Sequence, residues 1–150
     1  MAFFRIERST SLPPAECWRR VTDWERHAER VPLTRITVVP GVATGAGTVF
    51  VARTGVGPLG FDDPMEVVRW APPVAGRAGL CLLEKRGSPV RGRASIDVRP
   101  AESGSRVVWV EELRVRGLPG WTDPLIAAAG RRVFGRVLDD LLGRPERSGP

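Results

Sequence analysis

The chain has 150 residues, 42% of them hydrophobic and 27% charged, with a formal net charge of +6. Such a chain is long enough to bury the core of one globular domain without disulfides or metals. It contains no apolar run near the roughly 20 residues that span a bilayer, and the charged sequence MAFFRIER does not resemble a signal peptide, so we expect a cytoplasmic protein.

Residues that commonly bind metals are few. The chain has two cysteines, Cys17 and Cys81, and one histidine, His27. The cysteines lie far apart and match no zinc motif, and a single histidine excludes a site built from several histidines. We therefore expect two free thiols, no metal ion and no cofactor.

Arginine carries almost all of the positive charge, since Lys85 is the only lysine. The arginines are scattered through the sequence and do not gather on one predicted helix. Nucleic-acid-binding domains usually concentrate basic residues in a patch or stripe. Arginine-mediated contact with nucleic acid or with an acidic membrane is therefore the least favoured function, and neither partner is expected.

Residues 3–10 mix apolar and polar positions as a strand does. A helix is predicted next for LPPAECWRRV, with Pro13 or Pro14 in its first turn, where a missing N–H is tolerated. A second short helix is predicted for WERHAERV, between the N-cap candidate Asp23 and the terminating Pro32.

Residues 34–116 show strand and turn patterns only. Strands are predicted in TRITVVP, GTVFVART, MEVVRW, RAGLCLLEK, RASIDVRP and RVVWVEELRV. The segments between them, such as GVATGAG and GVGPLG, are rich in turn-forming residues. Short strands at this spacing favour an antiparallel sheet.

A long amphipathic helix is predicted from about Pro124 to Leu142, behind the N-cap candidate Asp123. Residues 144–150, which follow it, are expected to be a disordered tail. The apolar face of this helix consists of Ile126, Ala129, Val133, Val137 and Leu141.

Together these elements predict an α+β fold in a single domain, residues 1–143. It comprises a curved antiparallel sheet of about seven strands, two short helices after the first strand, and a long C-terminal helix over the concave face. A helix of about 19 residues is only ~28 Å long and ~10 Å wide. Because it can lie across such a face without filling it, an internal cavity is expected.

Four segments resemble the SRPBCC superfamily, whose START-like or helix-grip fold is shared by polyketide cyclase/dehydrase-like proteins and plant pollen allergens. They are LPPAECWRRVTDWERHAERVP, GAGTVF, VVRWAPP and GSRVVWVEEL, and they occur in the order and spacing of that family across residues 3–142. The resemblance implies the helix-grip fold. It leaves the activity open, because this fold hosts lipid carriers, ligand sensors, cyclases and chaperone activators.

In this family the first of the four segments forms the helix pair at one end of the sheet. The resemblance implies that Trp18 is a packing anchor and that Trp24 and His27 lie near the cavity mouth. His27 stands where the family often has an aromatic residue, so we expect it to cap or line the entrance rather than to catalyse.

The strand RVVWVEELRV presents two faces, and the face with Trp109, Glu111 and Leu113 is the more apolar. We assign this face to the cavity. Burial there would raise the pKa of the Glu111 carboxyl unless an arginine pairs with it. Glu111 is therefore a candidate for orienting a ligand hydroxyl or for acid–base catalysis, and the alternative is a solvated position at the rim.

Arg53 and Glu84 end otherwise apolar strands, so they are either a buried pair that recognises a polar ligand group or two solvated strand ends. Trp70 either lines the cavity or packs beside it. The catalytic candidates are Glu111 and Arg53. The predicted cavity-lining residues are Trp24, His27, Trp70, Glu84, Ile96, Val98, Trp109, Ala129 and Val133.

The favoured function is the binding of a small hydrophobic ligand, such as a lipid or a polyketide, by a monomer or homodimer. The alternative is a polyketide cyclase, aromatase or dehydratase. Enzymes of the resembled family use polar cavity residues, tyrosine and histidine among them, to polarise carbonyls and move protons. This chain has no tyrosine, which leaves Arg53 or Glu111 for such work.

Overall fold

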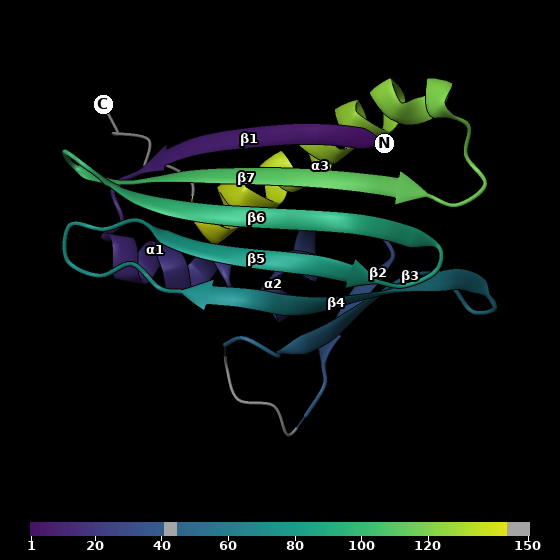
Figure 1. Cartoon of the computed structure of the whole chain (residues 1–150), viewed down its shortest axis with the longest axis horizontal. Coiled ribbons are helices and arrows are strands. Elements are labelled where there is room, and N and C mark those ends of the chain that lie inside the picture. Colours follow the sequence, from purple (N-terminus) through teal and green to yellow (C-terminus); the bar gives the residue numbers. More distant parts are fainter. Residues whose placement is uncertain (41–44, 144–150) are drawn as a thin grey trace, which may run out of the picture.

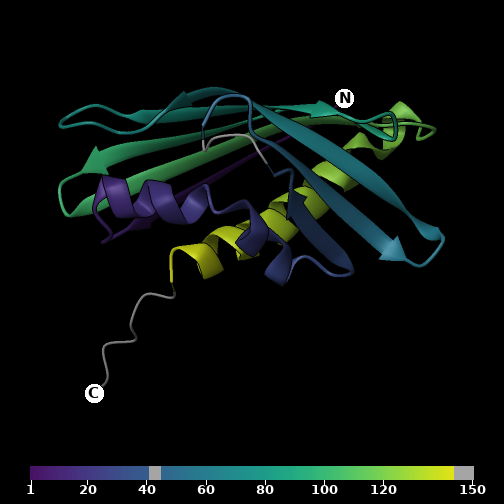
Figure 2. The ribbon, with the colours of Figure 1, turned by 90° about the horizontal axis from the view of Figure 1, so that it is seen from below.

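The fold is a curved antiparallel sheet with helices on its concave side, as the sequence predicts (Figures 1 and 2). The computed structural model describes residues 1–40 and 45–143, so the predicted tail and part of the GVATGAG loop lie outside the described residues. Within these ranges, seven strands form one sheet in the order β1-β7-β6-β5-β4-β3-β2. The strands are β1 (Ala2–Thr10), β2 (Thr34–Val38), β3 (Val49–Val56), β4 (Leu59–Ala71), β5 (Gly79–Arg86), β6 (Val90–Ala101) and β7 (Gly104–Val115).

The described residues also form three helices and two short 3₁₀ turns: α1 (Pro14–Val21), α2 (Trp24–His27), η1 (Ala28–Arg30), η2 (Gly120–Thr122) and α3 (Asp123–Leu141). Strands β2 to β6 each pair with the next strand along the chain, whereas β1 pairs with β7. The chain must therefore pass from one edge of the sheet to the other between β1 and β2. The helices α1 and α2 make that crossing under one end of the sheet (Figure 2).

Strand β4 begins six residues earlier than the predicted MEVVRW segment, which starts at Met65. The GVGPLG segment is a tight β3–β4 hairpin rather than a loop between separate strands, and Gly55 pairs with Gly60 in it. Gly55 has a φ of +131°, and a Cβ there would lie 2.2 Å from the Leu59 carbonyl oxygen. Glycine thus permits a close approach of the two strands that other residues would prevent.

Helix α3 lies across the concave face and packs mainly against β1. Val137 and Leu141 are buried as predicted, but Ala129 is exposed and Val133 is only half-buried. The face that meets the sheet is rotated by about one residue and consists of Ala127, Gly130, Phe134, Val137, Leu138 and Leu141. Gly130 sets this rotation, because a Cβ at that position would lie 2.4 Å from the ring of Phe4 on β1.

The end of the sheet beneath α1 is solidly packed. Helix α1 packs against β6, and Trp18 belongs to the same buried core as Ile96 and Val98, whose side chains are fully buried. Cys17 and Cys81 lie in the same core as free thiols, as predicted. Burial raises the pKa of Cys17 to about 11 and that of Cys81 to about 12, so both thiols stay protonated at neutral pH.

We predict that Val137→Asp strongly destabilises the protein, because Val137 is 1% exposed and the aspartate would be an unpaired buried charge. The expected loss in the free energy of unfolding is about 3–5 kcal/mol, measured by urea denaturation. Ala128→Asp places the same charge on the exposed side of α3 and is the matched control. Equal stability of the two variants would contradict the packing of α3 described above.

Candidate functional site: a cavity with a buried charged cluster

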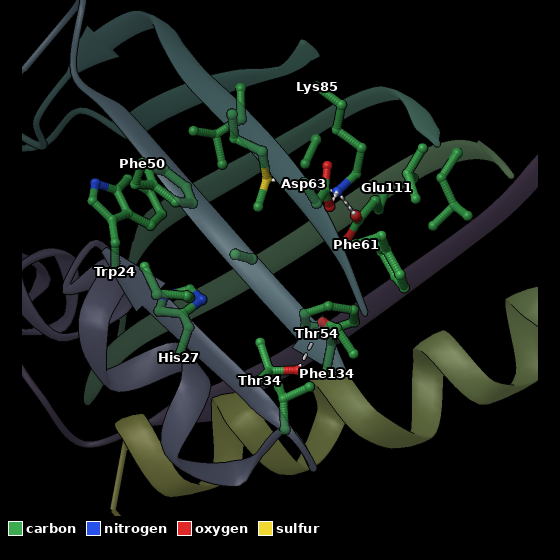
Figure 3. Close-up of a pocket in the computed structure, with 18 of the residues that line it drawn as sticks. Trp24, His27, Thr34, Phe50, Thr54, Phe61, Asp63, Lys85, Glu111 and Phe134 are labelled. Carbon is green, nitrogen blue, oxygen red and sulfur yellow. Dashed lines mark hydrogen bonds and ion pairs between the residues drawn. The ribbon is translucent and has the colours of Figure 1, made fainter. Parts of the chain in front are cut away.

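A cavity of about 200 Å³ lies between the concave face of the sheet and the helices α2 and α3 (Figure 3). Its walls are largely apolar, and strands β2 to β7 all contribute to them. The lining residues are Trp24, His27, Val31, Thr34, Ile36, Phe50, Ala52, Thr54, Phe61, Asp63, Met65, Leu83, Lys85, Val90, Ala94, Trp109, Glu111, Leu113, Val115 and Phe134.

Aromatic rings in successive contact form one wall of the cavity. The Trp24 ring stacks on Phe50 with 4.8 Å between centroids, and it lies 5.3 Å from the His27 ring. Trp109 lies 5.3 Å from His27 and 5.1 Å from Phe134. These rings join α2, β3, β7 and α3, and contacts at such distances stabilise the wall beyond simple area burial.

Beside Trp109, the cavity wall carries a buried cluster of charges made by Asp63, Lys85 and Glu111, whose side chains point toward one another (Figure 3). The Lys85 Nζ atom lies 2.7 Å from Asp63 Oδ2 and 3.3 Å from Glu111 Oε1. The side chains of Lys85 and Glu111 are only 5% and 4% exposed. Trp109 also donates a hydrogen bond from Nε1 to Glu111 Oε2, at 3.2 Å.

Small residues on β6 let these groups meet. Lys85 on β5 and Glu111 on β7 are separated by β6, whose cavity-side positions between them are Gly92 and Ala94. Gly92 is the register partner of Lys85, and Ala94 is the register partner of Glu111. Because neither residue projects a large side chain, the lysine can reach across β6 to the carboxylate.

The charges of the cluster do not balance, since two carboxyl groups face one ammonium group. Burial raises the pKa of Glu111, and the nearby Lys85 only partly offsets this effect. Burial by itself lowers the pKa of Lys85, but Glu111 and Asp63 outweigh it and raise that pKa. The lysine is therefore held as an ammonium ion, while Glu111 gains a proton more readily than an exposed glutamate.

The cluster also has unused hydrogen-bonding capacity. Asp63 Oδ1 is buried and has no hydrogen-bond partner among the described residues. The contact of Lys85 Nζ that is not to a carboxylate is with the Met65 sulfur at 3.6 Å, a weak acceptor. A ligand hydroxyl or carbonyl would therefore find both an acceptor and a donor in this wall.

His27 is part of the aromatic wall rather than a proton-transfer group. Its Nε2 atom lies 2.7 Å from the Val21 carbonyl oxygen, which can only accept, so Nε2 carries the proton. Burial lowers the pKa of His27 to about 4. The ring is therefore neutral at physiological pH and anchors α2 to α1.

Four of the residues proposed from sequence lie at this cavity: Trp24, His27, Trp109 and Glu111. Arg53 and Glu84 do not. Arg53 is exposed and pairs with Asp62 at 3.0 Å, and Glu84 pairs with Arg86 at 2.9 Å. Both side chains point to the convex face, because the neighbouring residues of their strands point inward. Arg53 and Glu84 therefore form no buried pair with each other. They are the two solvated strand ends of the alternative prediction.

The other proposed residues also lie outside the lining of this cavity. Trp70 packs edge-on against Trp18, 5.1 Å between centroids, beyond a bulge in β4. Ile96 and Val98 face inward but are covered by α1. Of the two helix residues, Ala129 is exposed and Val133 is displaced from the cavity by Phe134, for the rotation described above.

Sequence reasoning missed Lys85 and Asp63 as site residues. The signal for Lys85 was the alternation Cys81, Leu83, Lys85, which places the only lysine on the buried face of its strand. Asp63 had no such signal, because the predicted strand MEVVRW begins at Met65, whereas β4 begins at Leu59 and so includes Asp63.

Residues 1–144 match the protein family described as "Polyketide cyclase / dehydrase and lipid transport". The chain therefore belongs to this family. No curated protein sequence matches the chain.

Solved structures share the fold at low sequence identity. Norcoclaurine synthase from Thalictrum flavum, a point mutant in complex with a transition-state analogue, has 14% identity and a TM-score of 0.64, covering 93% of this chain and 92% of the other. The Zhui aromatase/cyclase from Streptomyces sp. R1128 has 13% identity and a TM-score of 0.59, covering 97% and 93%. The protein Ara h 8.0201 has 16% identity and a TM-score of 0.62, covering 93% and 97%.

Two further observations concern the part of the chain that the structure describes. None of its helices is both long and apolar enough to cross a membrane. None of its histidine, cysteine, aspartate and glutamate side chains form a group of three that would hold a metal ion.

We predict that His27 makes the protein less stable as the pH falls from 6.5 toward 4. In this range the unfolded state takes up a proton at the ordinary pKa of 6.5, whereas the folded state, with a pKa of about 4, does not. The full effect is on the order of 3 kcal/mol in the free energy of unfolding. Urea denaturation across this range should show a shallower pH dependence for His27→Gln, and identical slopes would contradict a neutral buried His27.

Lys85→Met should destabilise the protein by about 3–5 kcal/mol at neutral pH, because it leaves buried carboxylates without their cation. The loss should shrink as the pH falls toward 4.5, the ordinary pKa of Glu111, since protonation removes the uncompensated charge. Arg86→Met removes an exposed cation from the next position and should cost about 1 kcal/mol or less. Comparing each variant with the wild type at the same pH cancels the contribution of His27.

Proposed function

We propose that this protein binds a small, mostly apolar molecule in the cavity and orients it through one polar group held by the Asp63, Lys85 and Glu111 cluster. The observation that carries the proposal is a buried, incompletely hydrogen-bonded charged cluster in the wall of an otherwise apolar cavity. Such a site combines apolar area for affinity with a few polar groups for orientation.

The cavity limits the size of the ligand. Its volume of about 200 Å³ is somewhat larger than the ~150 Å³ that accommodates benzene. A ligand of one or two fused rings, or a short chain of equal volume, fits this space. The aromatic wall of Trp24, Trp109 and Phe134 favours a flat ring, which can stack or meet these rings edge-on.

The cluster also limits the charge of the ligand. With two carboxyl groups and one ammonium group, its formal charge is negative or, when Glu111 is protonated, neutral. An anionic ligand group would therefore be repelled by the cluster or would gain no net attraction from it. A neutral hydroxyl that donates to Asp63 or Glu111, or a carbonyl that accepts from Lys85, fits the donors and acceptors present.

The similar structures support a small-molecule role for this fold. One is named a norcoclaurine synthase and was solved with a transition-state analogue, and another is named an aromatase/cyclase. At 14% and 13% identity these similarities concern the fold, so the chemistry proposed for this chain depends on its own cavity residues.

Acid–base catalysis on a bound carbonyl compound is the second candidate function. The observation that favours it is a carboxyl group of raised pKa, Glu111, beside the buried ammonium group of Lys85. Lys85 would donate a hydrogen bond to the carbonyl oxygen while Glu111 took a proton from the adjacent carbon. The enolate carbon could then attack a second carbonyl of the same molecule, whose oxygen becomes an alkoxide and takes the proton back from Glu111. This is the carbon–carbon bond formation that a cyclase needs. Arg53, the other catalytic candidate, is not placed to take part.

We predict that 2-naphthol binds the folded protein with one molecule per chain, and more tightly than 2-methylnaphthalene, which has a similar shape but no hydroxyl. A hydrogen bond to a charged partner should give about a tenfold preference in affinity for 2-naphthol.

Glu111→Gln should reduce this preference, because it replaces a charge-assisted hydrogen bond with a neutral one. Glu112→Gln alters the adjacent residue, which points to the convex face and pairs with Arg93, and should leave the preference unchanged. Fluorescence titration of the naphthalene ring measures each affinity.

Equal affinities for the two naphthalenes in the wild type would contradict a polar anchor in the cavity. Equal effects of Glu111→Gln and Glu112→Gln would contradict the assignment of that anchor to Glu111. The catalytic candidate is tested separately, with a diketone that can cyclise. Loss of turnover in Glu111→Gln with nearly unchanged binding would favour catalysis over binding alone.

A further inference from the structure

The convex face of the sheet carries two pairs of arginines that face each other across β6 and β7. Arg99 is the register partner of Arg106 near one end of the hairpin, and Arg91 is the register partner of Arg114 near the other. Like charges directly opposite each other destabilise a sheet. Nearby carboxylates can offset this repulsion, and the two pairs differ in whether they have such partners.

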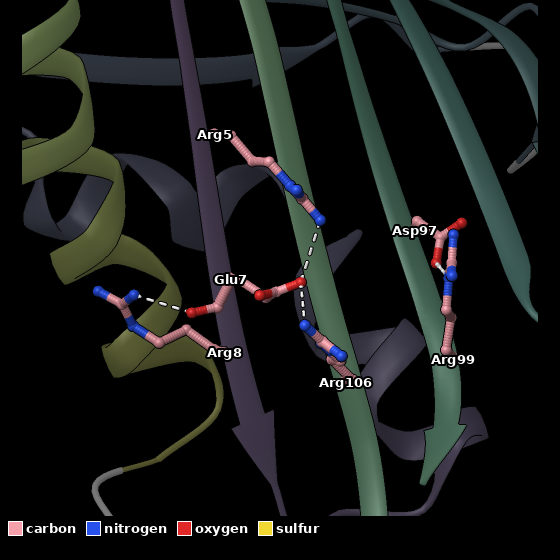
Figure 4. A network of polar contacts seen from close by, with 6 residues as sticks. All are labelled: Arg5, Glu7, Arg8, Asp97, Arg99 and Arg106. Carbon is pink, nitrogen blue, oxygen red and sulfur yellow. Dashed lines mark hydrogen bonds and ion pairs between the residues drawn. The ribbon is translucent and has the colours of Figure 1, made fainter.

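Carboxylates neutralise the first pair (Figure 4). Arg99 donates to Asp97 at 2.8 Å, and Arg106 lies 2.5 Å from Glu7, which also accepts from Arg5. Arg93 of β6 is neutralised in the same way, since it pairs with Glu112 at 3.0 Å. Paired arginines of this kind form no continuous basic surface for nucleic acid.

The second pair has no such partner. Within residues 1–40 and 45–143, neither Arg91 nor Arg114 makes an ion pair, and the same is true of Arg116, which adjoins them. Arg116 donates from Nη1 to the Ser88 hydroxyl at 3.0 Å, which fixes the direction of its guanidinium group. Together Ser88, Arg91, Arg114 and Arg116 line a shallow hollow of about 320 Å³, here called the arginine hollow.

We propose that the arginine hollow binds a phosphate group. Three guanidinium groups around one depression place three formal positive charges there, and no carboxylate is among the residues that line it. Guanidinium forks match the paired oxygens of phosphate and bind them through parallel N–H···O bonds. A phosphate dianion would thus replace the repulsion between Arg91 and Arg114 with a shared partner. This site lies on the convex face, so it is independent of the cavity on the concave face.

The same phosphate chemistry has two sources: a soluble phosphate ester and a phospholipid headgroup. Two exposed apolar residues that follow Arg116 are relevant to the choice between these sources. Leu118 and Trp121, which follow it in the connection from β7 to α3, are 50% and 74% exposed. If the phosphate belongs to a lipid, these two apolar side chains are available to contact the bilayer surface, so the tests below separate the two sources.

The first test titrates inorganic phosphate into the protein at constant ionic strength, with chloride as the balancing anion, and measures binding by calorimetry and by the shift in Tm. The wild type should bind one phosphate saturably, and Arg114→Gln should weaken binding by about tenfold or more. Arg106→Gln is the matched control, because it removes an exposed arginine from the same strand and the same face. It should change the affinity by about twofold or less.

The Tm is also measured without phosphate, so that loss of the binding site can be distinguished from poor folding of a variant. At low ionic strength in chloride, Arg114→Gln should keep or raise the Tm by about 1–3 °C, because it relieves repulsion from Arg91. Arg106→Gln removes a partner of Glu7 and should not raise the Tm. Binding of 2-naphthol in the cavity should be the same in both variants, so failure of this proposal is distinct from failure of the cavity proposal.

The second test uses vesicles of phosphatidylcholine with and without phosphatidic acid. Phosphate binding with no vesicle binding would support the site and assign it to a soluble phosphate ester. Sedimentation with phosphatidic acid vesicles that is lost in both Arg114→Gln and Trp121→Ala would support the site and assign it to a lipid headgroup. An equal loss of phosphate binding in Arg114→Gln and Arg106→Gln would overturn the proposal, because only general electrostatic attraction would remain. Absence of saturable phosphate binding would also overturn it, even if vesicles or an oligonucleotide bound.

Discussion

The width of the concave face is the constraint on which the rest of this structure depends. One helix of 19 residues packs against β1 but cannot also cover β2 to β5 of a seven-stranded sheet. The crossing from β1 to β2 supplies α1, which closes one end completely. Over the remaining area, side chains rather than backbone close the gap, through the ring contacts of Trp24, His27, Trp109 and Phe134. The cavity is the space that this arrangement leaves unfilled.

The polar character of the cavity depends on the absence of large side chains at two cavity-facing positions of β6. Since Gly92 and Ala94 project almost nothing into the cavity, Lys85 and Glu111 meet over them. A buried ion pair of this kind contributes little net stability, because desolvation of both groups offsets their attraction. In the proposed function, the cluster, with Asp63 as its third member, orients a neutral polar group of a ligand. Its imbalance of charge and its unpaired Asp63 oxygen are the features that a fully satisfied structural ion pair would lack.

Charged side chains have different surroundings on the two faces of the sheet. On the concave face, a few charges are desolvated and their pKa values shift, as for Glu111 and Lys85. On the convex face, arginines and carboxylates alternate between neighbouring strands, and solvent screens each pair. The arginine hollow departs from this pattern at one end of the β6–β7 hairpin. The hollow is thus a local concentration of positive charge, made by three arginines without a carboxylate among its lining residues.

The sequence by itself determined the order of the elements, the antiparallel sheet, the inward face of β7 and the existence of a cavity. Alternation in a strand has a period of two and therefore reports which side a residue faces, as it did for Trp109 and Glu111. It does not report what covers that side, so Ile96 and Val98 were assigned to the cavity although α1 covers them. Helical periodicity predicted a face of α3 that is wrong by about one residue, and the contact between Gly130 and Phe4 decided that Phe134 enters the cavity. The meeting of Asp63, Lys85 and Glu111 likewise required the tertiary structure, because it depends on the register of three strands and on the small residues between them.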